Sequence, residues 1–175
     1  MTRSSIDQQK LDEKKIIREL ERNSKQGIDN IGKNCGFSRQ KVWRIIKKLE
    51  EEQTIWGYKA VIDDERIGTK QFVMLIKSNP ISKKDILDKI INLTLTKKVE
   101  TIGIEIESGG LVHGAYDWML NFSALDLKQV KKFGEMFIKE YPNLVKKIDI
   151  LEYVFPLKKC GMKNPNIDKL KEYFV

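Results

Sequence analysis

The sequence predicts an α+β protein in which a winged-helix-like helix-turn-helix unit precedes a ferredoxin-like βαββαβ unit. Two observations support this. A glycine-containing turn precedes a basic amphipathic helical pattern in the first third, and strand-like and helix-like apolar patterns alternate in the rest. A polar connection containing Gly68 separates the two. We therefore expect domains over 1–62 and 71–160, a linker over 63–70 and a tail over 161–175.

The first domain reads as three helices followed by a strand. Apolar residues at helical spacing begin at Ile16, stop at the polar stretch 23–27, and resume with Ile31 and Cys35. Ser38 is placed to cap a third helix by accepting a hydrogen bond from its first turn. The predicted buried stripe of that helix is Val42, Ile45, Ile46 and Leu49. A strand is expected over residues 55–62.

Between Lys33 and Lys48 the chain has six basic residues and no acidic one, within a net charge of +8. A tight turn followed by a basic helix is how a protein presents one helix to the DNA major groove. Gln40, Arg44 and Lys47 should project opposite the apolar stripe. A solvated helix face is the alternative reading of the charge, and packing on a neighbouring helix is the alternative for Trp43. The predicted DNA-binding residues are Ser38, Arg39, Gln40, Lys41, Trp43, Arg44, Lys47 and Lys48.

The second domain alternates strands with helices. Expected strands cover residues 72–77, 99–107, 112–122 and 148–157. Ser82 with Asp85 resembles a capping box for the first helix, and Asp126 is placed to cap the second. A Gly109-Gly110 hairpin turn should join the middle strands. The predicted core face of the second helix is Leu127, Val130, Phe133 and Phe137. In the tail, residues 164–175 should form a short helix that docks through Ile167, Leu170 and Phe174.

Composition excludes several classes of function. Cys35 and Cys160 match no zinc or redox spacing, and residues 1–10 lack an apolar leader, so we expect a reduced, cytoplasmic chain. No apolar run approaches the ~20 residues of a membrane span. His113 is the single histidine, which argues against most histidine-based metal or triad chemistry. We expect no catalytic residue, no metal site and no cofactor.

The two halves together resemble the Lrp/AsnC family of regulators, in which a helix-turn-helix is joined to a βαββαβ "RAM" domain. In the first half the resemblance rests on Ser38, Val42, Ile46, Leu49-Glu50 and Ile55-x-Gly57-Tyr58. In the second half it rests on Gly114-x-Tyr116-Asp117. It implies a transcriptional regulator that binds double-stranded DNA and assembles as a homodimer, a tetramer or an octamer. It also implies a small amino acid as effector, bound near Gly114, Tyr116 and Asp117.

Two other functions remain compatible with the sequence. Relatives with the same two-domain plan are siroheme decarboxylases, although a chain with one histidine and no arginine after Arg66 is poorly equipped for tetrapyrrole chemistry. A DNA-compacting protein without sequence preference is also compatible with the basic charge. For Asp117, a structural hydrogen bond is the alternative to a ligand contact.

Overall fold

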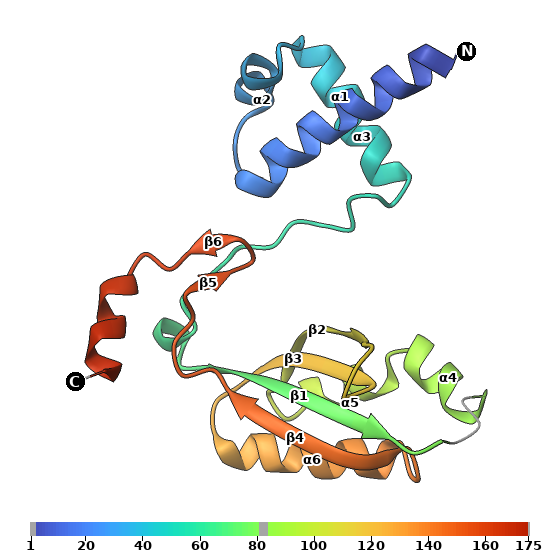
Figure 1. Ribbon diagram of the computed structural model, residues 1–175, viewed down its shortest axis with the longest axis vertical. Helices are drawn as coiled ribbons and strands as arrows, with labels where there is room; N and C mark the ends of the chain where they lie inside the picture. Colours follow the sequence, from blue (N-terminus) through green and yellow to red (C-terminus); the bar gives the residue numbers. More distant parts are fainter. Residues whose placement is uncertain (1–2, 81–83, 175) are drawn as a thin grey trace. The chain divides into compact units, whose positions relative to one another are not determined.

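The structure, a computed structural model, describes residues 3–80 and 84–174 in two compact units (Figure 1). The first unit comprises residues up to Val61 together with the chain from Leu157 onward, and the second comprises residues 62–156. The C-terminal tail is thus grouped with the N-terminal helices rather than with the sheet.

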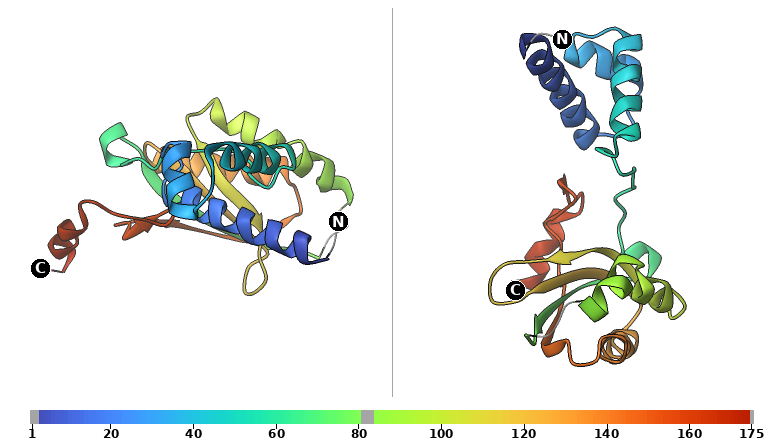
Figure 2. Two further views of the ribbon diagram at one scale, coloured as in Figure 1. Left: turned by 90° about the horizontal axis from the view of Figure 1, so that it is seen from above. Right: turned by 90° about the vertical axis from the view of Figure 1, so that its right-hand side faces the viewer.

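The N-terminal unit contains three packed helices, as the sequence predicts (Figure 2). They are α1 (Arg3–Arg22), α2 (Ile28–Cys35) and α3 (Arg39–Glu51). Each contributes apolar side chains to one small core. The buried members of that core are Ile16, Ile31, Val42, Ile45 and Leu49.

The segment after α3 differs from the prediction, because residues 55–62 form no strand. They run as an exposed connection, in which the Trp56 side chain is 95% exposed. The β-branched and aromatic residues here have strand propensity, but a strand forms only where a second strand takes up its backbone hydrogen bonds. Within this unit no other described segment pairs with residues 55–62 as a ladder.

The second unit is a four-stranded antiparallel sheet with helices on one face. Its strands are β1 (Lys70–Ser78), β2 (Glu105–Leu111), β3 (Trp118–Ala124) and β4 (Val145–Glu152), in the order β2-β3-β1-β4. Its helices are α4 (Lys84–Ile91), α5 (Thr94–Glu100) and α6 (Leu127–Glu140), and a short 3-10 helix η1 (Glu65–Ile67) precedes β1. This order is the predicted ferredoxin-like arrangement.

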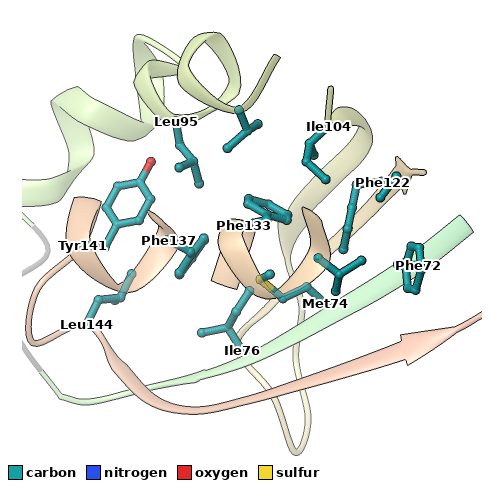
Figure 3. Close-up of a cluster of buried hydrophobic side chains, with 13 residues drawn as sticks. Phe72, Met74, Ile76, Leu95, Ile104, Phe122, Phe133, Phe137, Tyr141 and Leu144 are labelled. Atoms are coloured by element: carbon teal, nitrogen blue, oxygen red, sulfur yellow. The ribbon is translucent and has the colours of Figure 1, made fainter. Parts of the chain in front are cut away.

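The core of the second unit lies between the sheet and the helices α5 and α6 (Figure 3). Alternate residues of β1 supply Phe72, Met74 and Ile76, all buried. Phe133 of α6 meets Phe122 of β3 edge-on, with ring centroids 4.7 Å apart. Helices cover only this face, so no described element of this unit covers the other face of the sheet.

The stretch between α4 and β3 departs from the prediction. Val99, expected in a strand, is a buried residue of α5, a helix that the sequence did not suggest. The predicted Gly109-Gly110 turn lies inside β2, and the turn instead spans residues 112–117. A Cβ at Gly109 would lie 2.4 Å from Cδ2 of Leu120 on β3, so a larger residue there would have to displace the end of the Leu120 side chain.

Three smaller differences concern the ends of elements. Leu127, predicted to face the core, is 65% exposed because it opens α6 before the helix turns its apolar face inward. The last strand of the sheet covers residues 145–152 rather than 148–157. Ser82 of the predicted capping box lies outside the described residues.

The tail contains a hairpin that the sequence did not predict, followed by a helical turn. The hairpin pairs β5 (Lys158–Lys159) with β6 (Met162–Lys163), and the 3-10 helix η2 (Ile167–Tyr173) follows. The predicted anchoring of Phe174 is not observed, since this side chain is 83% exposed.

The described residues offer neither a membrane-spanning helix nor a cluster of metal ligands. None of their helices combines the length and apolar character needed to span a bilayer. Their His, Cys, Asp and Glu side chains form no group of three that could hold a metal ion.

Candidate nucleic-acid interface

The turn between α2 and α3 fixes the direction in which α3 leaves the core. Gly36 ends α2 in the left-handed region, at φ +71°, and the Phe37 N–H donates to Gly32 O at 2.8 Å. A Cβ on Gly32 would lie 2.7 Å from Phe37 O, so only glycine allows this close approach. Ser38 Oγ then accepts a hydrogen bond from the Lys41 N–H at 3.3 Å, which is the predicted cap.

Helix α3 has one buried face and one exposed face. Val42, Ile45 and Leu49 are buried in the three-helix core. Gln40 and Arg44 lie on the exposed face. That face also includes the exposed side chains of Arg39, Trp43 and Lys47. The face is therefore polar, basic and open to a partner.

Trp43 belongs to the exposed face rather than to the helical core. Its side chain is 54% exposed, and Lys47 Nζ lies 5.3 Å from the ring centroid. Packing of Trp43 on a neighbouring helix was the alternative interpretation. The lysine that lies over its ring, Lys47, is instead on α3 itself.

Two of the predicted DNA-binding lysines are held by carboxylates of α1. Lys41 Nζ lies 2.7 Å from Asp12 Oδ2, and Lys48 Nζ lies 2.7 Å from Glu13 Oε1. The hydrogen bond from Lys41 holds the pKa of Asp12 below its ordinary value, and the bond to Glu13 raises the pKa of Lys48. These pairs flank the buried stripe and join α3 to α1. The sequence does not predict these two ion pairs, because each acid lies about thirty residues away from its lysine along the chain.

The remaining cations of α3 differ in how strongly they are engaged. Arg39 pairs with Asp29 at 2.5 Å, with both side chains exposed, and Lys47 lies 3.6 Å from Glu51. Exposed pairs of this kind exchange readily for other partners. Arg44 has no ion-pair partner among the described residues. It is therefore the most available arginine of the exposed face.

The residues predicted to bind an effector lie in the turn 112–117. Asp117 accepts hydrogen bonds from the Ser78 N–H at 2.7 Å and Ser78 Oγ at 2.9 Å, and it pairs with Lys77 at 3.0 Å. The Ser78 backbone bond, with Lys77, lowers the pKa of Asp117 to about 2. Asp117 thus ties the turn to the end of β1, which is a structural role.

Tyr116 and Gly114 occupy the same turn. The Tyr116 hydroxyl donates to Asp149 Oδ2 on β4, and this bond raises the pKa of the phenol. Gly114 has φ +148°, and a Cβ at this position would meet no atom within 4 Å. The backbone at Gly114 is therefore open to approach, while Tyr116 is committed to Asp149.

Charge divides sharply between the two units. Residues 1–61 and 157–175 contain 19 lysines and arginines against 11 aspartates and glutamates. Residues 62–156 contain 14 of each. The whole net charge of +8 thus belongs to the helical unit with its tail, and the sheet unit is neutral. An anionic partner would meet the helical unit.

Comparison with known proteins supports this geometry. A family described as winged helix-turn-helix DNA-binding matches residues 13–55, which span α3 and its turn. The chain is 25% identical over 118 residues to the leucine-responsive regulatory protein of Haemophilus influenzae, covering 67% of this chain and 68% of the relative. An AsnC family transcriptional regulator from Agrobacterium tumefaciens matches over both units, with a TM-score of 0.63 and 20% identity, covering 97% of this chain and 99% of that one.

The chain is similar to transcriptional regulators of the Lrp/AsnC type in sequence and in fold. A further structural neighbour of this chain is a transcriptional regulator from Neisseria meningitidis solved with L-methionine, at a TM-score of 0.66 and 16% identity. That match covers 89% of this chain and 96% of the neighbour. The proteins from Haemophilus influenzae and Agrobacterium tumefaciens are named as regulators, and neither name describes an enzyme.

Proposed function

We propose that this chain is a transcriptional regulator that binds double-stranded DNA sequence-specifically by inserting the exposed face of α3 into the major groove. The observation that supports this most strongly is the position of Gln40 and Arg44, directly opposite the stripe that anchors α3 in its core. A helix anchored in this way presents the same side chains in a fixed direction, as groove reading requires.

The proposal gives different roles to different side chains of α3. Arg44 and Gln40 would contact base edges, since arginine pairs with guanine and glutamine with adenine. Ser38, Arg39 and Lys47 would contact phosphates, with Trp43 at the edge of the footprint. Lys41 and Lys48, already held by α1, would act mainly by fixing α3 and adding positive potential. The proposal therefore gives each of the eight predicted residues a role in the interface.

Assembly as a homodimer follows from the uncovered face of the sheet. Val73, Leu75 and Met119 are half-buried on this face, and Leu151 is 53% exposed. Apolar side chains gathered on a sheet face are normally buried against another layer. A second copy of this sheet would supply that layer and bring together two recognition helices. Light scattering at micromolar concentration should give at least twice the chain mass of 20.4 kDa, and a monomer would contradict the dimer.

The proposal includes a small amino acid as effector, bound near the turn 112–117. The relative from Neisseria meningitidis was solved with L-methionine, and Gly114 here leaves its backbone open. Tyr116 and Asp117 would contribute by ordering the turn. Calorimetry with the proteinogenic amino acids tests this directly, and no heat with any of them would exclude an amino-acid effector. Binding that survives Asp117→Ala would remove Asp117 from the site.

Selection of bound fragments from random double-stranded DNA tests the function itself. The proposal predicts an enriched palindromic motif whose half-sites lie one helical turn apart, because a two-fold dimer presents two copies of α3. A compacting protein without sequence preference would enrich no motif. Such a result would replace the regulator by the alternative of non-specific DNA binding.

A further inference from the structure

The hairpin of the C-terminal tail brings two lysines face to face. Lys158 of β5 pairs directly with Lys163 of β6 in the antiparallel register. The two-residue turn between the strands, Cys160-Gly161, has φ values of +48° and +79°, the pattern of a tight type I′ turn. Residues opposite each other in such a ladder project from the same face, so both ammonium groups lie on one side of the hairpin.

This arrangement is unfavourable for the isolated chain. Like charges directly opposite each other destabilise a strand pair. Lys158 and Lys163 are both exposed, and within residues 3–80 and 84–174 neither has an ion-pair partner. A carboxylate near either lysine would relieve the repulsion. The other cross-strand pair of the hairpin, Lys159 with Met162, supplies no carboxylate. Water and salt screen part of this repulsion because both side chains are exposed, and a polyanion from outside the chain would relieve it further.

The rest of the tail has the same sign. Residues 157–175 contain five lysines against two acidic residues, and Lys169 of η2 is exposed without an ion-pair partner in the described chain. These residues belong to the unit that contains α3, and not to the neutral sheet unit. The tail therefore adds to the positive charge of the unit that is proposed to bind DNA.

We propose that the β5–β6 hairpin is a second DNA contact, in which Lys158 and Lys163 bind backbone phosphates of the DNA that α3 reads. This inference rests on the proposed DNA-binding function. Lysine is a flexible point charge that suits phosphate rather than base recognition. The contact would therefore raise affinity for every sequence alike and leave the preferred motif unchanged.

Binding isotherms of the full-length protein at several salt concentrations test the proposal. The variant is Lys158→Gln with Lys163→Gln, measured on the selected site and on unrelated DNA. Each phosphate contact removed should flatten the plot of log K against log salt by about 0.9. The loss of two contacts should raise Kd roughly 60-fold near 0.1 M salt on both DNAs, and the effect should be larger where both hairpins of the dimer contact the DNA. Lys158→Arg with Lys163→Arg retains both charges and should keep the original salt dependence.

A matched control removes two charges elsewhere. Lys131 and Lys132 are exposed residues of α6 in the neutral unit, and their replacement by Gln should leave the salt dependence unchanged. An unchanged slope for the Lys158/Lys163 variant would overturn the proposal. If Arg44→Ala still weakened binding in that case, the proposed function would stand without the tail. Failure of the unmodified protein to bind any DNA would overturn both.

Discussion

Replacement of Arg44 by alanine should both weaken binding and relax specificity at one base position. Arg44 is exposed on α3 and has no ion-pair partner in the described part of the chain, so its fork is available to a guanine. A bidentate contact of this kind is worth about 1–3 kcal/mol, and a symmetric dimer makes it twice, giving about 2–6 kcal/mol in total. Because about 1.4 kcal/mol corresponds to a tenfold change in Kd, the substitution should raise Kd by a factor between roughly 30 and roughly 10⁴.

Fluorescence anisotropy on the selected site measures this change, with single-base variants of the site in parallel. For the unmodified protein, changing the guanine in both half-sites should cost as much as removing the Arg44 side chain, and changing it in one half-site should cost about half as much. For Arg44→Ala, the same base change should cost almost nothing further, because the contact is already absent. Arg44→Lys keeps the charge without the bidentate fork and should bind nearly as weakly as Arg44→Ala.

Arg18→Ala is the matched control, since Arg18 is an exposed arginine of α1 in the same unit. It removes one positive charge without touching α3 and should not alter preference at any base. If Arg44→Ala and Arg18→Ala had equal effects on every sequence, the effect would be charge alone. The assignment of Arg44 to base reading would then be wrong.

Three further predictions concern stability. Asp117→Asn should lower the melting temperature at neutral pH. Because folding lowers the pKa of Asp117 from 3.8 to about 2, the ionised carboxylate stabilises the fold above pH 3.8, and this stabilisation should vanish as the pH falls to about 2. A difference in melting temperature that does not change with pH would refute this prediction. Phe133→Ala should lower the free energy of unfolding in urea by about 3–5 kcal/mol, since Phe133 is fully buried against Phe122. A decrease below about 1 kcal/mol would contradict the position of Phe133 in the core. Lys48→Gln should lower the melting temperature more at low than at high salt, because the substitution breaks the ion pair with Glu13. If the substitution changed only DNA affinity, Lys48 would instead be a phosphate contact.

Local sequence signals predict the recognition helix well. The Ser38 cap and the stripe Val42, Ile45 and Leu49 depend on neighbours within a few residues, so periodicity alone identifies them. The ion pairs made by Asp12 and Glu13 could not be predicted in this way, because they arise only when α1 packs against α3. An acidic pair on the helix that precedes a basic one would be the signal to look for.

The errors in the second half have a common physical cause. Short apolar spacings fit a strand and a helix equally well, so the pattern places Val99 in a strand although it belongs to α5. The Gly109-Gly110 pair is typical of a turn, whereas the missing side chain of Gly109 makes room for Leu120 across the ladder. The hairpin of β5 and β6 could not be predicted from the sequence, because its strands are two residues long and consist mostly of lysine. In each case tertiary contacts decide between conformations that the local sequence allows equally.

Hydroxyl-radical footprinting of the full-length protein on its selected site tests the central claim most directly. A dimer that reads DNA with two copies of α3 should protect two tracts on one side of the duplex, with centres 10–10.5 base pairs apart or a multiple of that spacing. Arg44→Ala should reduce both tracts together. Continuous protection that is independent of sequence, or protection unchanged in Arg44→Ala, would contradict the account.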